Sequence, residues 1–178
     1  NRIVVAAGAN AALDGESVRR AMRELELCSQ DVVVTQLEIP LPAVEAALSM
    51  ARETGARRVL NATPWSDVAL ELLHSCDVLV VNALKARQAA GVGSEEPIEL
   101  VATRLVEHVP IVVVTLGGEG AVLVTKHERL QCRAPHVPVV DTTAAGDAFT
   151  AALAVSLLEG ESWEGTLVRA VWAGALTV

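Results

Sequence analysis

The chain has 178 residues, of which 52% are hydrophobic, and a formal net charge of −8. This length and apolar content are enough for one buried core and predict a single domain over 1–178. The scattered basic residues and an aromatic content of 2% argue against a nucleic acid partner, and no apolar run approaches the roughly 20 residues that span a bilayer.

Three cysteines, Cys28, Cys76 and Cys132, are far apart in the sequence, and none of them forms a C-x-x-C pair. An odd number at this spacing argues against a disulfide framework and against a zinc site. We therefore expect a protein of the reducing cytoplasm that has no membrane partner.

The expected strands are short β-branched runs separated by amphipathic segments. The first five lie, in chain order, at 3–7, 31–35, 58–61, 77–81 and 111–115. This alternation predicts an α/β fold with a mainly parallel sheet. The runs are apolar throughout, as is usual where helices cover both faces of a sheet.

Start and stop residues mark the helices between these strands. The expected helices are 15–27 capped by Asp14, a helix with Pro42 in its first turn that ends at Gly55, and 67–73 capped by Ser66. The loop-like stretch 91–97 is expected to join two further helices.

The pattern changes after residue 115. Three apolar runs at 120–125, 129–134 and 137–140 follow one another with room only for hairpin turns. They predict an antiparallel edge to the sheet.

A glycine-rich stretch, TLGGEG, runs from Thr115 to Gly120 directly after a predicted strand. Glycines let a backbone approach a ligand closely, and ligands in open α/β sheets collect beyond the carboxyl ends of the strands. A tight hairpin between two strands explains the same residues without any ligand. The order of residues matches neither a P-loop nor a dinucleotide fingerprint.

The stretch VVDTTAAGDAF, residues 139–149, is more informative. Helical periodicity begins near Ala144, which puts the backbone amides of Ala145, Gly146 and Asp147 among those without intrahelical partners. With the helix dipole they form a site for a phosphate or for charge developing on one. The alternative from the residues alone is that Asp147 only complements the dipole.

These motifs resemble the ribokinase-like sugar kinase family, also called the phosphofructokinase-B type. DTTAAGD matches its D-T-x-[GA]-A-G-D signature, and GAN at 8–10, QLE at 36–38, LNATP at 60–64 and TLGGEG occur in the family's order. GAN and QLEIP resemble the ribokinase branch. The resemblance implies a three-layer α/β/α fold, of which this chain is expected to be the C-terminal portion without the N-terminal part and the lid.

The resemblance also implies roles for individual residues. Asp147 would be the general base and would contact the sugar together with Glu38, for which a solvated strand-end carboxylate is the alternative. Ala144, Ala145 and Gly146 would complete the anion hole beside Asp147. Nucleotide phosphates would bind at Asn82, Thr115, Gly117, Gly118 and Gly120, and Asp141 and Thr143 would belong to a monovalent-cation loop, with K⁺ the expected ion.

One position departs from the family pattern. Where the family carries N-x-x-E, this chain has Asn82-Ala83-Leu84-Lys85. The family glutamate helps to organise Mg²⁺, which a lysine cannot do, although its ammonium can contact phosphate. The alternative is that Lys85 is a solvated residue on a helix face, with magnesium held through water and phosphate.

The resemblance therefore implies an ATP-dependent, magnesium-requiring kinase of a small sugar, with D-ribose phosphorylated at its primary hydroxyl as the leading expectation. The alternatives are a kinase of another sugar or nucleoside and a non-catalytic sugar- or nucleotide-binding relative. A homodimer formed through the absent lid is the expected assembly.

Overall fold

The structure is a computed structural model and describes residues 8–65 and 67–178. The expected strand at 3–7 and the expected cap Ser66 lie outside these residues. Two short 3₁₀ turns, η1 (Gly8–Ala12) and η3 (Gly117–Glu119), accompany the longer elements.

Within the described residues, six strands form one sheet in the order β1 to β6. The strands are β1 (Val32–Gln36), β2 (Arg57–Asn61), β3 (Val78–Asn82), β4 (Ile111–Thr115), β5 (Ala121–Val124) and β6 (Arg129–Cys132). The pairs from β1 to β4 are parallel. β5 pairs antiparallel with both of its neighbours, β4 and β6. The mainly parallel sheet with an antiparallel edge is confirmed.

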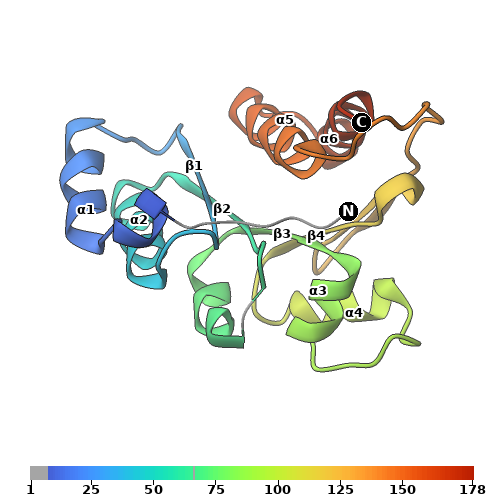
Figure 1. The fold of residues 1–178 in the computed structure, drawn as a ribbon, viewed down its shortest axis with the longest axis horizontal. Helices are drawn as coiled ribbons and strands as arrows, with labels where there is room; N and C mark the ends of the chain where they lie inside the picture. The colour runs from blue at the N-terminus through green and yellow to red at the C-terminus, as the bar shows by residue number, and fades with distance from the viewer. Residues whose placement is uncertain (1–7, 66) are drawn as a thin grey trace.

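Helices cover both faces of this sheet (Figure 1). One side carries α2 (Leu41–Thr54), η2 (Asp67–Ser75), α3 (Ala83–Ala89) and α4 (Ile98–Leu105), with α1 (Gly15–Glu24) packed on α2; the other carries α5 (Ala145–Glu159) and α6 (Trp163–Leu176). β4 shows how one apolar strand serves both layers. Its Val112 and Val114 pack with the first group of helices, and Val113 packs with α5 and α6.

The predicted helix signals are largely confirmed. Asp14 accepts a hydrogen bond from the backbone N–H of Ser17 at 2.7 Å, which lowers the pKa of its carboxyl group. Gly55 ends α2 in the left-handed conformation, with φ of 76°. α1 stops at Glu24, before the expected residue 27, because Glu26 has a φ of 49° that no right-handed helix accommodates.

The expected strand at 137–140 is wrong. The sheet ends at β6, and the chain then runs irregularly to α5. Proline lacks the N–H that a strand ladder needs, and Pro135 and Pro138 both stand in this stretch. Val139 and Val140 are 65% and 91% exposed, so their apolar character does not reflect a buried strand.

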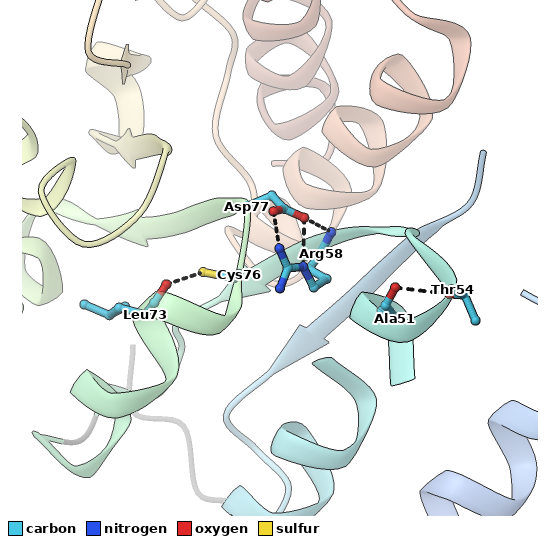
Figure 2. A network of polar contacts seen from close by, with 6 residues as sticks. All are labelled: Ala51, Thr54, Arg58, Leu73, Cys76 and Asp77. Atoms are coloured by element: carbon cyan, nitrogen blue, oxygen red, sulfur yellow. Dashed lines mark hydrogen bonds and ion pairs between the residues drawn. The ribbon is translucent and has the colours of Figure 1, made fainter. Parts of the chain in front are cut away.

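An ion pair joins the amino ends of β2 and β3 (Figure 2). The Arg58 guanidinium donates to both carboxylate oxygens of Asp77, and the Arg58 backbone N–H donates to the same carboxylate at 2.8 Å. The neighbouring Cys76 is buried, which raises the pKa of its thiol to about 12. This end of the sheet has a structural role, and the candidate site lies at the opposite end.

Candidate functional site

The carboxyl ends of the parallel strands meet at one edge of the sheet. Asn61, Asn82 and Thr115 are the last residues of β2, β3 and β4, and Glu38 follows β1 in an exposed loop. Ligands of open α/β sheets bind at this edge. The structure therefore gathers most of the predicted site residues at the end of the sheet where chemistry is expected.

Helix α5 is tied to this edge by a polar link across its first turns. The side-chain amide of Asn61 donates to the Thr150 hydroxyl at 3.2 Å, and that hydroxyl donates to the backbone oxygen of Gly146 at 2.8 Å. Helix α6 approaches the same turn through Gly174, since a Cβ added to Gly174 would be 3.1 Å from the Ala145 carbonyl oxygen. The first turn of α5 is thus held from two sides.

The start of α5 exposes unpaired backbone donors. The amide of Ala145 donates to the Thr142 carbonyl at 3.4 Å, but the amides of Gly146 and Asp147 have no acceptor within the described part of the chain. Ala144, the N-cap, has a φ of 63°, a conformation that costs alanine about 1 kcal/mol. Such strain often persists where it positions functional groups.

Asp147 lies in the first turn of α5, and its side chain is exposed to solvent. A Cβ added to Gly146 would meet nothing within 4 Å, so the space beside this glycine is open. A carboxylate and free amides therefore share one helix turn, as the sequence predicted.

A cavity of about 390 Å³ opens beside this turn. Thr115, Gly117, Gly118 and Gly120 line one side of it, and Ala145 and Gly146 line another. The remaining wall is mostly apolar and consists of Ala134, Pro135, His136, Val137, Val139, Thr142, Phe149, Val171, Gly174, Ala175 and Val178. The glycine turn at 115–120 and the helix N-terminus at Ala145 thus face one space.

The glycine turn itself is the predicted hairpin. The Leu116 amide donates to the Gly120 carbonyl at 2.8 Å, and the Gly120 amide donates to the Gly117 carbonyl at 3.0 Å. Gly117 and Gly118 nevertheless border the cavity. The hairpin and the ligand-binding interpretations of TLGGEG are therefore compatible.

A second cavity of about 520 Å³ adjoins the first and shares Thr115 and Gly117 with it. Asn82, Arg87, Glu99 and Glu119 are among its polar walls. Asn82 caps α3 by accepting a hydrogen bond from the Lys85 amide at 2.9 Å. Lys85 is half-buried and lines neither cavity.

Asp141 and Thr143 form a compact turn in the loop before α5. One carboxylate oxygen of Asp141 accepts from the backbone N–H of Thr143 at 3.0 Å and from its hydroxyl at 2.8 Å. The hydrogen bond from the Thr143 amide lowers the pKa of Asp141, so the carboxylate is charged at neutral pH. It is exposed and stands six residues before Asp147.

No group of three or more histidine, cysteine, aspartate or glutamate side chains in residues 8–65 and 67–178 is arranged to hold a metal ion. Mg²⁺ in phosphoryl-transfer sites is usually held by one or two protein oxygens together with substrate phosphates and water. Asn82, Glu99 and Glu119 offer such oxygens around the second cavity. In the same described ranges, no helix has both the length and the apolar character to cross a bilayer.

Sequence reasoning missed several residues of this site. Asn61 and Thr150 position α5, and Phe149, Val171 and Gly174 complete the cavity. LNATP was one of the motifs of the family resemblance, but no role was predicted for its Asn61. Nothing in the spacing of α6 distinguishes its cavity-lining residues from ordinary core positions.

The pfkB family carbohydrate kinase model matches residues 1–178, and the chain belongs to this family. Among curated proteins, the chain is similar to ribokinase of Haemophilus influenzae, with 33% identity over 100% of this chain and 58% of the relative. Ribokinase of Schizosaccharomyces pombe is 32% identical at the same two coverages. Deoxyribokinase of Salmonella typhi is 30% identical, over 100% of this chain and 59% of its own.

Solved structures agree with this assignment. The chain superimposes on ribokinase of Thermotoga maritima with a TM-score of 0.85 and 30% identity, covering 100% of this chain and 59% of that one. Arabidopsis thaliana ribokinase complexed with ribose and ATP gives a TM-score of 0.83 and 30% identity, covering 99% and 58%. The chain therefore spans somewhat more than half the length of each of these relatives.

Proposed function

We propose that the complete protein transfers the γ-phosphoryl group of ATP to the primary hydroxyl of D-ribose. The observation that carries this proposal is the first turn of α5, where an exposed Asp147 and two unpaired amides lie next to a cavity that Ala145 and Gly146 border together with the glycine turn. The similarity to ribokinases, one of them solved with ribose and ATP, supports the choice of sugar and nucleotide.

In the proposed reaction, the Asp147 carboxylate accepts the proton of the sugar hydroxyl as its oxygen forms a bond to the γ-phosphorus. The bond between that phosphorus and the bridging oxygen of ADP breaks, and the amides of Gly146 and Asp147 bind the equatorial oxygens. Phosphoryl transfer depends mainly on such positioning and charge stabilisation. Mg²⁺ on the phosphates would neutralise part of their charge.

The other assigned residues have supporting roles in this proposal. Thr115, Gly117, Gly118 and Gly120 would border the nucleotide phosphates, with Asn82 beside the metal. Glu38 would contact sugar hydroxyls from its exposed loop. The charged Asp141, with Thr143, would hold K⁺ next to the anion hole, and three unpaired cysteines suit the proposed cytoplasmic location.

Turnover of the complete protein with ATP, measured in an ADP-coupled assay, tests the proposal. D-ribose, 2-deoxyribose, fructose and adenosine should be compared as acceptors. The proposal predicts the highest kcat/KM with D-ribose and a product phosphorylated on the primary hydroxyl. Preference for 2-deoxyribose would move the assignment toward the deoxyribokinase relatives.

Lys85 favours a second candidate function, a binding protein that has lost turnover. It replaces the glutamate of the family's N-x-x-E motif at the third position of α3. Titration calorimetry distinguishes the candidates when it is combined with the turnover assay. Ribose and nucleotide affinity without ADP release would establish the binding protein and reject the kinase.

Replacing Lys85 with glutamate should raise kcat about tenfold, because changes beside metal ligands typically alter activity on this scale. The dependence of kcat on magnesium should become steeper. The substitution restores a hard oxygen atom near Asn82. It also completes a capping box, since a glutamate at this position can accept from the Asn82 backbone N–H.

The variant Lys85→Gln separates these effects, because glutamine completes the capping box without adding a charge. We expect Lys85→Gln to raise the melting temperature without raising kcat. If both variants change only the melting temperature, Lys85 is a solvated helix residue and has no part in the metal site.

A further inference from the structure

The unpaired amide of Asp147 belongs to a peptide group whose carbonyl end is hydrogen-bonded inside the protein. That carbonyl is the one of Gly146, and it accepts from the Thr150 hydroxyl at 2.8 Å. A peptide group is planar and rigid, so a bond that fixes its oxygen also fixes the direction of its N–H. The buried Thr150 side chain is therefore connected to the proposed anion site through a single peptide.

A threonine in a helix often donates to a carbonyl one turn earlier, as Thr54 of α2 does to Ala51 at 3.1 Å (Figure 2). Thr150 differs because its hydroxyl also accepts a hydrogen bond from another element, the side-chain amide of Asn61 at 3.2 Å. A hydroxyl has a single hydrogen, so a hydroxyl that donates to Gly146 can only accept from Asn61. The bonds therefore form a series with one direction, from Asn61 through Thr150 to the peptide of Gly146.

Asn61 fixes the start of this series to the sheet. It is the last residue of β2, and this strand pairs with β1 on one side and β3 on the other. Thr150 is only 4% exposed, so water competes little for its hydroxyl. Hydrogen bonds in series polarise one another, and each one strengthens the next donor. The last donor of this series is the N–H of Asp147, which lies in an exposed turn.

We infer that Asn61 and Thr150 are positioning residues for phosphoryl transfer, which orient and polarise the Asp147 amide toward the transferring group. The inference rests on the proposed function, because it takes this amide to bind an equatorial oxygen of that group. Both side chains act through the peptide and not by touching a substrate. Interactions that strengthen in the transition state alter kcat more than KM, so the effect of the pair should fall on kcat.

The test is steady-state kinetics of the complete protein with ATP and the acceptor that gives the highest turnover. The wild type should be compared with Thr150→Val, Thr150→Ser, Asn61→Leu and the double variant of Thr150→Val with Asn61→Leu. Valine keeps the shape of threonine without the hydroxyl, serine keeps the hydroxyl, and leucine approximates asparagine without its amide. Melting temperatures should be measured for each protein.

Thr54→Val is the matched control. It removes a hydroxyl that also donates to carbonyls one turn earlier, those of Met50 and Ala51. Thr54 ends α2 three residues before β2 begins, so it lies at the end of the sheet opposite to the candidate site. Any loss of kcat that comes only from removing a helical threonine hydroxyl should appear in this variant too.

Thr150→Val should lower kcat about tenfold, less than the roughly 10²–10³-fold cost of removing an anion-hole donor, because the Asp147 amide itself remains. The KM values for ATP and the acceptor should change little. Thr150→Ser should keep most of the wild-type kcat, and Thr54→Val should keep all of it.

Asn61→Leu should lower kcat less than Thr150→Val, because the hydroxyl can still donate to Gly146. The double variant should be no slower than Thr150→Val, since Asn61 acts only through that hydroxyl. Two unrelated packing defects would instead multiply their losses.

A wild-type kcat in Thr150→Val, or an equal loss in Thr54→Val, would overturn the inference and leave the proposed function intact. Losses that multiply in the double variant, or that fall on KM alone, would also overturn it. If Thr150→Val does not fold, Asn61→Leu decides, because an unchanged kcat there excludes the series. If the wild type transfers no phosphoryl group to any acceptor, the proposed function fails and the inference fails with it.

Discussion

Asp147→Asn in the complete protein should lower kcat by about 10²–10⁴-fold, which corresponds to roughly 3–5 kcal/mol of transition-state stabilisation. An asparagine side chain keeps the size of the aspartate but cannot accept the hydroxyl proton. ATP affinity should change little, because the proposed anion site consists of the unpaired backbone amides of Gly146 and residue 147. Steady-state kinetics and calorimetry with an ATP analogue measure the two effects.

Glu164→Gln is the matched control for this prediction. Glu164 is the acidic residue in the first turn of α6, so it has the same relation to a helix dipole, but no residue of that turn borders the cavity. Each substitution should cost about 0.3–1 kcal/mol of stability, and only Asp147→Asn should affect kcat. A rate loss below about tenfold for Asp147→Asn, with a lowered melting temperature, would mean that Asp147 only complements the dipole.

Gly120→Ala should destabilise the protein by about 4 kcal/mol or more. Gly120 has a φ of 98°, and an added Cβ would lie 1.9 Å from the Cys132 carbonyl oxygen and 2.9 Å from the Arg133 carbonyl carbon. These atoms are backbone, so the clash can be relieved only by moving β6 away from β5. Urea unfolding of the complete protein measures the loss.

Gly118→Ala provides the comparison within the same turn. Gly118 does not have a positive φ, and an added Cβ there would meet nothing within 4 Å. Its effect on the free energy of unfolding should stay within about 0.5 kcal/mol. Similar losses for both variants would contradict the steric account of Gly120.

Features encoded by local sequence could be predicted without the structure. The apolar strands defined the parallel sheet, Asp14 and Gly55 marked helix ends, and the onset of periodicity after Ala144 located Asp147 in a first turn. Each of these depends on a few neighbouring residues. The TLGGEG hairpin could be predicted for the same reason.

Features that depend on distant contacts could not be predicted. The hydrogen bond between Asn61 and Thr150 joins residues 89 apart, and no local pattern pairs them. The α6 residues that line the cavity could not be predicted for the same reason, because the opposite wall lies far away in the sequence. The strand predicted at 137–140 is wrong because its valines match a strand pattern, whereas Pro135 and Pro138 lack the N–H that strand pairing needs. Val139 and Val140 are exposed.

We propose, as the central step of phosphoryl transfer, that the unpaired amides at the start of α5 bind the transferring phosphoryl group. The most direct measurement is the amide proton NMR shift of Gly146 and Asp147 in the complete protein with Mg²⁺, ADP, D-ribose and aluminium fluoride as the phosphoryl mimic. We expect downfield shifts for both amides when fluoride completes the complex, and no change for Gly91 in the α3–α4 loop. Unchanged shifts at Gly146 and Asp147 in a complex that contains bound ADP and fluoride would contradict it.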